Sequence, residues 1–413
     1  MNNTKAVIAM SGGVDSSVAA LLTKDKGFEC IGATMKLFNN EDIGRSREKS
    51  CCSLDDVEDA RSVAQSLGMK YYVFNFSDDF RAAVIDRFVA DYENGRTPNP
   101  CIDCNRYLKF DKLYRRAREI GFDYVVTGHY ARIGHNGSRY VLKKAVDETK
   151  DQSYVLYSMT QEQLAHTLLP LGELHKTDVR EIAEKHGFIN AKKHDSQDIC
   201  FVQEGSYADF IKQHTGKDYP PGDFIDTSGS VLGTHKGIIC YTVGQRRGLG
   251  ISSEESYYVK EIRPSDNTVV LCREAELYSK TLTADNINLI SVPEIKEPMR
   301  VSAKVRYRQQ AQQATVIQTD ENTLKIEFDE PQRAVTAGQA VVLYDGDTVV
   351  GGGTILEQDK EDTPIRNRIG VSSLSQTVKK SVNTLRRSLI CRCRNFRISP
   401  SACTVYALRY SAA

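Results

Sequence analysis

The chain has 413 residues, of which 40% are hydrophobic and 26% charged, with a formal net charge of +1 at pH 7. This length exceeds one ordinary hydrophobic core and predicts two or three domains, while the composition is that of a soluble globular protein. No apolar run approaches membrane-spanning length, and no signal-peptide segment follows the N-terminus. These features exclude a membrane partner, and we expect a cytoplasmic enzyme.

The basic residues are distributed unevenly. Residues 364–413 contain ten Lys or Arg and no Asp or Glu, so the rest of the chain carries 45 basic and 54 acidic residues, a balance of −9. Because such a field repels phosphate, a nucleic-acid surface on the rest of the chain must be a local patch. We interpret residues 358–413 as a poorly ordered basic tail, with an RNA-binding extension as the alternative.

The most informative stretch lies near the N-terminus. An apolar run at 6–10 predicts a buried parallel strand, and the residues from Ser17 onward predict a helix. Between them, Ser11, Gly12 and Gly13 let the backbone approach a ligand closely and point successive amides at it. The turn leads into a helix N-terminus, where the helix dipole favours an anion such as pyrophosphate. No Gly-Lys-Ser/Thr follows, which excludes a Walker loop; a glycine turn without ligand is the alternative.

Strands and helices alternate through the first part of the chain. Strand-like runs at 30–36, 71–76 and 124–131 are separated by helical patterns at 54–67, 80–92 and 110–120. This alternation predicts a doubly wound parallel sheet in an α/β domain, which we place at residues 1–204. Ligands of such sheets bind beyond the carboxyl ends of the strands, where Ser11, Met35 and Gly128 fall. We further predict a polar loop at 39–50, a helix at 171–186, and a loop at 192–202 leading into a strand.

The second half of the chain predicts two β-rich domains. Frequent glycines divide short segments beyond residue 207, which indicates a small central β-rich domain at 205–280. Short alternating runs beyond residue 282 predict a C-terminal antiparallel β-barrel, placed at 281–357. The glycine-rich stretch 241–250 is interpreted as a β-turn with a basic surface or as an RNA-facing hinge. The alternation from Arg306 to Arg308 indicates either the solvent face of a strand or an RNA contact.

The chain contains eleven cysteines. Without an export signal, they argue against a disulfide scaffold and for thiol chemistry or metal binding in some of them. Two prolines in 97–105 fix an extended approach to a Cys-x-x-Cys formed by Cys101 and Cys104, with a helix predicted to begin at 107–110. A thiol near a helix N-terminus has a lowered pKa and is a competent nucleophile. A third cysteine, Cys200, lies further along the chain. We assign core or surface roles to Cys30, Cys51, Cys52, Cys240 and Cys272.

A series of motifs, in order, resembles the bacterial tRNA-specific 2-thiouridylases, a family of PP-loop ATP pyrophosphatases. The resemblance covers roughly residues 5–355. The motifs are Ser-Gly-Gly-Val-Asp-Ser-Ser at 11–17, Gly-Ala-Thr-Met at 32–35, Thr-Pro-Asn-Pro…Cys-Asn at 97–105, Thr-Gly-His-Tyr-Ala-Arg at 127–132, Lys-Asp-Gln-Ser-Tyr at 150–154, Asp-Ser-Gln-Asp-Ile-Cys-Phe at 195–201, Tyr-Thr-Val-Gly-Gln-Arg-Arg-Gly-Leu-Gly at 241–250 and Val-Arg-Tyr-Arg at 305–308.

The resemblance implies an adenine nucleotide alpha hydrolase-like first domain and a tRNA-uridine 2-sulfurtransferase that thiolates uridine 34, the wobble base, in the tRNAs for Lys, Glu and Gln. The uracil O2 attacks the α-phosphorus of ATP, pyrophosphate leaves, and C2 becomes electrophilic; AMP is the second product. Mg²⁺ is expected because it neutralises the triphosphate. The implied ATP-binding residues are Ala9, Met10, Ser11, Gly12, Gly13, Val14, Asp15, Ser16, Met35 and Gly128.

The same resemblance implies the sulfur chemistry and the partners. Cys200 carries a persulfide that delivers sulfur to C2, and Cys104 is the nucleophile that releases it, leaving a Cys104–Cys200 disulfide for a reductant to open. The partners are the tRNA anticodon loop and a sulfur donor, either a cysteine desulfurase or a relay protein, and we expect a monomer. The residues implied to contact the target base are Asn99, Pro100 and Cys101, and those implied to contact tRNA elsewhere are His129, Lys150, Asp151, Gln152, Arg306, Tyr307 and Gln339.

Several alternatives stay open at the level of sequence. Many relatives carry Asp where this chain has Cys101, so Cys101, Cys104 and Cys200 could instead ligate a [4Fe-4S] cluster that holds the sulfur. The chain could also be a PP-loop ligase acting on a small molecule, or an RNA-binding or cluster-carrying module with a vestigial ATP loop. Asp15 either caps the loop helix or organises phosphate or magnesium. His129 is either a satisfied histidine at a strand end or a tRNA contact.

Overall fold

The computed structural model describes residues 4–38, 54–194, 199–202 and 206–356, all within one compact unit. The predicted polar loop at 39–50, the thiols Cys51 and Cys52, the first part of the 195–201 motif and the basic tail lie outside the described residues. No helix in the described part of the chain is long and apolar enough to cross a membrane.

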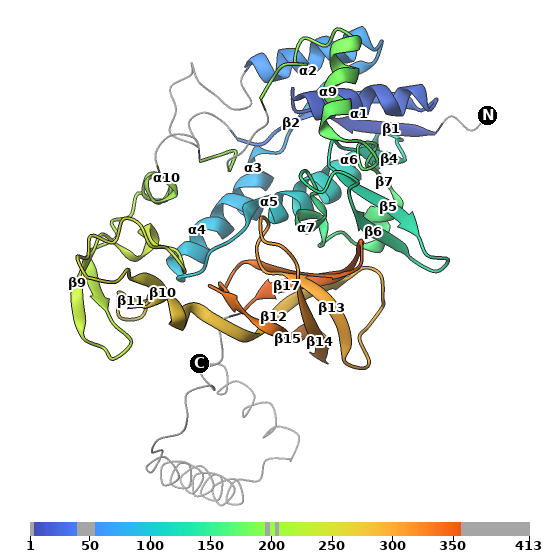
Figure 1. The fold of residues 1–413 in the computed structure, drawn as a ribbon. Helices are drawn as coiled ribbons and strands as arrows, with labels where there is room; N and C mark the ends of the chain where they lie inside the picture. Colours follow the sequence, from blue (N-terminus) through green and yellow to red (C-terminus); the bar gives the residue numbers. More distant parts are fainter. Residues whose placement is uncertain (1–3, 39–53, 195–198, 203–205, 357–413) are drawn as a thin grey trace, which may run out of the picture. The chain divides into compact units, whose positions relative to one another are not determined.

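The first domain is built on a parallel sheet with the strand order β3-β2-β1-β4-β7 (Figure 1). Each neighbouring pair runs parallel. The chain moves outward from β1 to β3 and then crosses to β4 on the other side of β1, so the prediction of a doubly wound sheet is confirmed. The strands are β1 (Lys5–Ala9), β2 (Glu29–Lys36), β3 (Lys70–Asn75), β4 (Tyr124–Val126) and β7 (Thr167–Leu168).

Helices cover both faces of this sheet because alternate residues of β1 point in opposite directions. Ala6 and Ile8 pack with α1 (Val14–Asp25), α2 (Leu54–Ser66) and α9 (Lys176–Lys185), whereas Val7 packs in a second hydrophobic cluster on the other face. The helices that contribute to this second cluster include α3 (Ser77–Phe80), η2 (Arg81–Ile85), α4 (Asp86–Glu93), η3 (Cys104–Lys112), α6 (Leu113–Glu119) and α10 (Tyr207–Thr215).

Three predicted boundaries in this domain were wrong. The loop helix begins at Val14 rather than Ser17. The helix that carries Cys101 and Cys104, called the cysteine helix below, begins with α5 (Pro100–Asp103) and not at 107–110. The Asn99 side chain caps it by accepting a hydrogen bond from the Cys101 amide (3.2 Å), and Pro100 occupies its first turn. The run 124–131 is divided after Val126 by a turn. Residues 199–202 form a turn, which agrees with the predicted loop at 192–202, but the next described element is the helix α10 and not a strand.

The central domain contains a sheet with the order β10-β11-β8-β9, in which β11 and β8 run parallel and the other pairs antiparallel. Its core includes Phe224, Tyr241 and Val259. The elements are β8 (Gly222–Ile225), β9 (Val231–His235), η4 (Ile238–Cys240), β10 (Tyr258–Arg263), β11 (Thr268–Cys272) and η5 (Glu274–Leu277).

The C-terminal strands form a closed antiparallel barrel, as predicted. They follow the order β12-β15-β14-β13-β16-β17, and β12 also pairs with β17, which closes the barrel. Because β13 ends at Lys304, Arg306 to Arg308 lie in the turn that follows, and their interpretation as a strand face was wrong. The strands are β12 (Tyr278–Leu289), β13 (Met299–Lys304), β14 (Gln312–Asp320), β15 (Thr323–Arg333), β16 (Ala340–Asp345) and β17 (Thr348–Ile355).

A hairpin of the first domain extends the barrel sheet. The hairpin consists of β5 (Ala131–His135) and β6 (Tyr140–Lys144), and Lys143 pairs with Thr348 of β17. The short helices α7 (Ser153–Leu156) and α8 (Gln161–Ala165) pack in the same cluster as this hairpin and the barrel strands β16 and β17. The barrel is therefore attached directly to the segment that follows β4.

Candidate functional site

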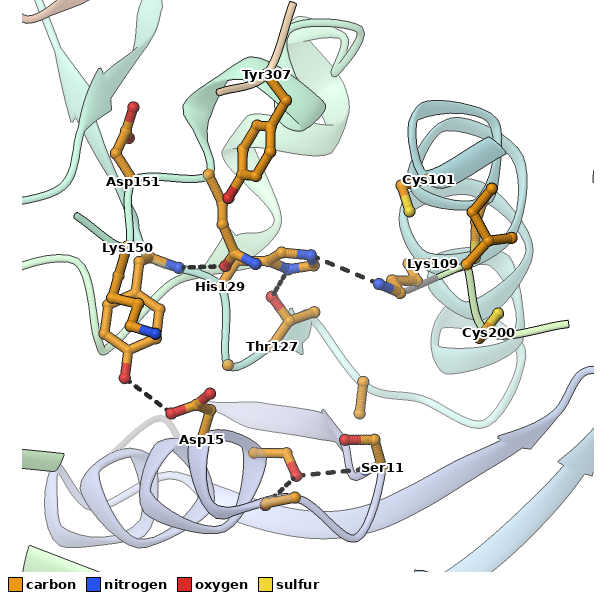
Figure 2. A pocket seen from close by; sticks show the side chains of 18 of the residues that line it. Ser11, Asp15, Cys101, Lys109, Thr127, His129, Lys150, Asp151, Cys200 and Tyr307 are labelled. Atoms are coloured by element: carbon orange, nitrogen blue, oxygen red, sulfur yellow. Dashed lines mark hydrogen bonds between the residues drawn. The ribbon is translucent and has the colours of Figure 1, made fainter. Parts of the chain in front are cut away.

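A cavity of about 1380 Å³ lies beyond the carboxyl ends of β1, β2 and β4. Figure 2 shows that its walls come from the loop at 11–13, called the glycine loop below, the cysteine helix, the turn after β4 and the barrel turn that carries Tyr307. It therefore combines segments from distant parts of the chain. Among the described residues, the lining includes the predicted site residues Ala9, Met10, Ser11, Gly13, Val14, Asp15, Ser16, Met35, Pro100, Cys101, Cys104, Gly128, His129, Lys150, Asp151, Gln152, Cys200 and Tyr307.

The glycine loop is held in a single shape by its own hydrogen bonds. Gly12 has a φ of +75°, and a Cβ there would lie 2.3 Å from the Asp56 carbonyl oxygen, so only glycine fits. The Ser16 hydroxyl donates to the Gly13 carbonyl (3.0 Å) and accepts from the Ser11 amide (3.3 Å). The loop leads directly into α1, whose positive N-terminal end borders the cavity. This arrangement suits a bound phosphate group.

Two residues that the sequence analysis missed hold this loop through side-chain hydrogen bonds. The Asn190 side chain donates to the Gly12 carbonyl and to the Ser17 hydroxyl, each at 2.9 Å. Lys193 also donates to the Gly12 carbonyl (3.3 Å), and it pairs with Asp56 and with Asp59, the latter at 2.7 Å. Partial burial lowers the pKa of Lys193, but its hydrogen bonds to the two carboxylates outweigh this and raise the pKa. No motif marks these residues, because the fold alone brings them to the loop.

Asp15 is part of an ion pair rather than a helix cap. Gly13 occupies the N-cap position of α1, so the interpretation of Asp15 as a cap was wrong. The Lys176 ammonium donates to both oxygens of the Asp15 carboxylate, at 2.7 and 2.8 Å, and the Tyr130 hydroxyl donates to one of them at 2.8 Å. A Cβ on Gly128 would lie 2.8 Å from the Ser16 amide nitrogen, so glycine lets the turn after β4 pack against the loop.

The cysteine helix places two thiols at the opposite wall. Cys104 is 8% exposed, whereas Cys101 opens toward the cavity. The predicted lowering of the thiol pKa was wrong. Loss of contact with water raises the pKa of both thiols, by burial of Cys104 in the helix and by the protein atoms around Cys101. Cys200 is exposed and lines the same cavity from the 199–202 turn, where the neighbouring Phe201 packs edge-on against Phe80 and Phe88.

Two further polar residues connect these walls. The His129 ring lies 2.7 Å from the Thr127 hydroxyl through Nδ1 and 3.5 Å from the Lys109 ammonium through Nε2 (Figure 2). Burial, and secondarily Lys109, holds the pKa of His129 well below its usual value, so its ring is neutral. Since an ammonium can only donate, Nε2 is the acceptor and Nδ1 carries the hydrogen. His129 is therefore a satisfied histidine that still lines the cavity.

The structure separates the predicted tRNA-contacting residues into two groups. Lys150, Asp151, Gln152 and Tyr307 line the cavity. Their neighbours Lys144 and Lys304 do so too, and both bring positive charge close to aromatic rings; the Lys304 ammonium lies 6.0 Å from the Tyr307 ring centroid. Burial lowers the pKa of Lys304, and the Asp151 carboxylate opposes this effect. This wall is thus polar, basic and partly aromatic.

The other group supports the cavity walls. Among the predicted site residues, Gly12, Asn99, Arg306 and Gln339 are not part of the described lining. The Arg306 guanidinium donates to the carbonyls of Val243 (3.2 Å) and Ala334 (3.0 Å), which joins the central domain to the barrel. The Gln339 side-chain amide donates to the carbonyls of Thr97 (2.8 Å) and Pro98 (3.2 Å) and so holds the segment ahead of the cysteine helix.

Sequence models of known families match all three domains. The model described as the tRNA methyl transferase HUP domain matches residues 4–204, the PRC-barrel domain of the same family matches 208–273, and an aminomethyltransferase beta-barrel domain matches 279–355. A tRNA-specific 2-thiouridylase MnmA of Clostridioides difficile is 52% identical over 86% of this chain and 98% of its own length. The chain belongs to the tRNA-specific 2-thiouridylase family.

Other 2-thiouridylases are similarly close. The protein of that name from Acetivibrio thermocellus is 51% identical over 86% of this chain and 100% of its own length. The one from Clostridium acetobutylicum is 49% identical over 86% of this chain and 99% of its own length. The resemblance on which the sequence analysis relied is therefore confirmed, and the three family models fall in turn on the parallel-sheet domain, the central domain and the barrel.

Proposed function

We propose that the protein is an ATP-dependent tRNA-uridine 2-sulfurtransferase, which replaces the O2 atom of uridine 34 by sulfur in the tRNAs for Lys, Glu and Gln. One observation carries this proposal: a single cavity is lined both by the glycine loop and by Cys104 and Cys200. An adenylating loop without the cysteines would serve many reactions. The cysteines without the loop would have no activated carbon to attack.

The first step is adenylation of the base. The loop from Ala9 to Ser16 holds the phosphates of ATP through its amides and the N-terminus of α1, and Met35 and Gly128 lie on the adenosine side. The uracil O2 attacks the α-phosphorus, and pyrophosphate leaves. Magnesium arrives with the triphosphate as part of the substrate and neutralises charge during this displacement. C2 of the base becomes electrophilic because its oxygen is now bonded to AMP.

The second step transfers sulfur. The outer sulfur of a persulfide on Cys200 attacks C2, and AMP leaves with the original O2. The thiolate of Cys104 then attacks the Sγ atom of Cys200, and the electron pair of the broken S–S bond goes to the sulfur on C2. This exchange leaves 2-thiouridine and a Cys104–Cys200 disulfide, which a thiol reductant opens. The turn that holds Cys200 must approach the cysteine helix when the tRNA is bound.

The remaining lining residues recognise the anticodon loop. A wobble base lies in a single strand and turns into a pocket at low cost. Pro100 and Cys101 face the target base, and Asn99 holds them by capping their helix. Lys150 contacts phosphate, and Tyr307 stacks on a base. His129, Asp151 and Gln152 complete this wall. Arg306 and Gln339 support recognition indirectly: Arg306 joins the central domain to the barrel, and Gln339 holds the segment ahead of the cysteine helix. The persulfide sulfur comes from a cysteine desulfurase or from a sulfur relay protein.

The reaction through a [4Fe-4S] cluster requires Cys101, Cys104 and Cys200 to converge on one cluster. Within the described ranges, no group of three or more His, Cys, Asp or Glu side chains is arranged to hold a metal ion. The cysteines therefore do not fit a cluster in this conformation, and we derive no step through one.

Anaerobic purification followed by a thiolation assay tests this proposal. The full chain, with its iron and sulfide contents measured, is given ATP, unmodified tRNA for Lys and a persulfide donor; pyrophosphate and 2-thiouridine are quantified. We expect iron-free protein to form both products, and Cys200→Ser to retain pyrophosphate release without thiolation. Full formation of 2-thiouridine by Cys200→Ser would contradict the role of Cys200 as the sulfur carrier, whereas pyrophosphate release that needs no tRNA and persists in Cys200→Ser would favour a small-molecule ligase. The absence of pyrophosphate release in the unaltered protein would favour an RNA-binding module.

A further inference from the structure

The cysteine helix changes its winding at Cys104. Residues Cys104–Lys112 form the π-helix η3, between the α-helical turns α5 and α6. In an α-helix, a residue five positions further along lies about 140° away around the axis. In a π-helix, the hydrogen bond from residue i to residue i+5 places the two residues on adjacent turns of the same face. The change of winding therefore brings Lys109 to the face of the helix that carries Cys104, and both residues line the cavity.

The charge of Lys109 acts on both thiols of this wall. Burial raises the pKa of Cys104, with Cys101 and Asp103 adding to the rise, and the Lys109 ammonium opposes it. Lys109 likewise opposes the raised pKa of Cys101. The negative charge of Asp103 is partly offset by Arg87, which lies 3.6 Å from its carboxylate. Lys109 is the cation positioned to offset the burial of the thiols.

The position of this ammonium is fixed from the other side of the cavity. Lys109 reaches from the cysteine helix to Nε2 of His129, which in turn is held by Thr127 at the end of β4 (Figure 2). Because the buried His129 ring stays neutral, it accepts from Lys109 without repelling it. The positive charge at this point of the cavity therefore resides on Lys109, between the nucleotide wall and the thiols.

We propose that Lys109 is a positioning residue of the sulfur-transfer step, whose ammonium, anchored on His129, stabilises the thiolate of Cys104. This inference rests on the proposed function. The proton of the Cys104 thiol passes to water in the cavity, and the thiolate then attacks Sγ of Cys200 with cleavage of the S–S bond toward the sulfur on C2. Lys109 retains its own protons and forms no covalent bond. The winding of the π-helix places the amine on the face of the helix that carries the thiol.

The test measures the thiol directly, without tRNA or ATP. The full chain is alkylated with iodoacetamide across a pH series, and peptide mass spectrometry follows the modification of Cys104, with Cys240 as the internal reference. Lys109→Met and Lys109→Gln remove the charge, and Lys109→Arg keeps it. Lys112→Met is the matched control, since Lys112 lies in the same π-helix but pairs with Asp79 at 2.7 Å.

In both neutral variants we expect the midpoint of Cys104 alkylation to rise by about one pH unit, and its rate below the midpoint to fall about tenfold. Lys109→Arg and Lys112→Met should keep the profile of the unaltered protein. The pH profile of 2-thiouridine formation should shift in the same direction, and below the midpoint the amount of 2-thiouridine formed per pyrophosphate released should fall. A loss of structure alone would not produce this pattern, and thermal melting of each variant confirms its fold.

An unchanged Cys104 profile in both neutral variants would overturn the inference. An equal shift in Lys112→Met would do so too, because it would show a general effect of helix charge. If the unaltered protein released no pyrophosphate and formed no 2-thiouridine while the Cys104 profile still shifted in the Lys109 variants, the proposed function would fail and the assignment of Lys109 to the thiol would stand.

Discussion

The two ends of the cavity are built in different ways. At the nucleotide end, the glycine loop is fixed by hydrogen bonds among close neighbours in sequence, and Asn190 and Lys193 add support from a distant segment. At the sulfur end, Cys104 lies in a buried helix turn, whereas Cys200 lies exposed in a separate turn. In the proposed reaction, the first end binds ATP in a preformed loop, whereas the second end must bring two thiols together around a tRNA.

The largest expected effect is a variant that loses 2-thiouridine formation but keeps pyrophosphate release. In Cys104→Ser, we expect 2-thiouridine formation to fall by about a thousandfold or more, because a hydroxyl cannot exchange with a persulfide. Pyrophosphate release should change by less than about twofold. The measurement is a parallel assay of both products. Equal loss of both would show that the two ends are not independent, and Cys272→Ser, a buried thiol of the central domain, is the control.

The next effect addresses the preorganised end. Gly12→Ala adds a Cβ at a φ of +75°, 2.3 Å from the Asp56 carbonyl oxygen, so the loop must shift. We expect pyrophosphate release to fall about a hundredfold, since small misplacements of reacting groups cost about this much. Gly27→Ala is a matched control, because it has a φ of +85° but its Cβ would meet no described atom within 4 Å. Similar losses in both variants would argue against a special role for the loop.

A smaller effect tests the support of the sulfur end by the barrel. Gln339→Ala removes the hydrogen bonds at 2.8 and 3.2 Å that hold the carbonyls of Thr97 and Pro98. At about 1 kcal/mol each, their loss should reduce 2-thiouridine formation about thirtyfold and leave pyrophosphate release nearly unchanged. Gln318→Ala, in which another barrel glutamine loses its bond to the Ile295 amide (2.9 Å), should leave both products unchanged. A loss confined to pyrophosphate release would contradict this role of Gln339.

The smallest effect concerns stability and pH. Burial lowers the pKa of His129, so below about pH 6.5 the unfolded chain binds a proton that the native ring does not. The free energy of unfolding therefore decreases as the pH falls, by about 1.4 kcal/mol per pH unit from this residue. In His129→Gln this contribution is absent, and the difference between the two unfolding curves should diminish on acidification. Denaturant unfolding at pH 7, 6 and 5 measures it; parallel curves would refute a neutral buried ring.

The sequence by itself determined much of the fold and of the nucleotide end. Apolar runs of strand length, alternating with helical patterns, were enough to predict the doubly wound sheet, and short alternating runs were enough to predict the barrel. The glycine loop could also be predicted from the sequence, because a φ of +75° at Gly12 and a helix that starts directly after it are local properties. The hairpin β5–β6 and the start of α5 were missed, since barrel pairing and the Asn99 cap decide them.

The tertiary structure alone decided the electrostatics and the partners of the site. Lys176, Asn190 and Lys193 reach the loop from beyond residue 175, and no spacing in the sequence marks them. The thiol pKa values were predicted with the wrong sign, because position at a helix start was visible and burial was not. Backbone conformation depends on near neighbours in sequence, whereas burial and charge pairing depend on which distant segments pack together, and only the folded chain defines that packing.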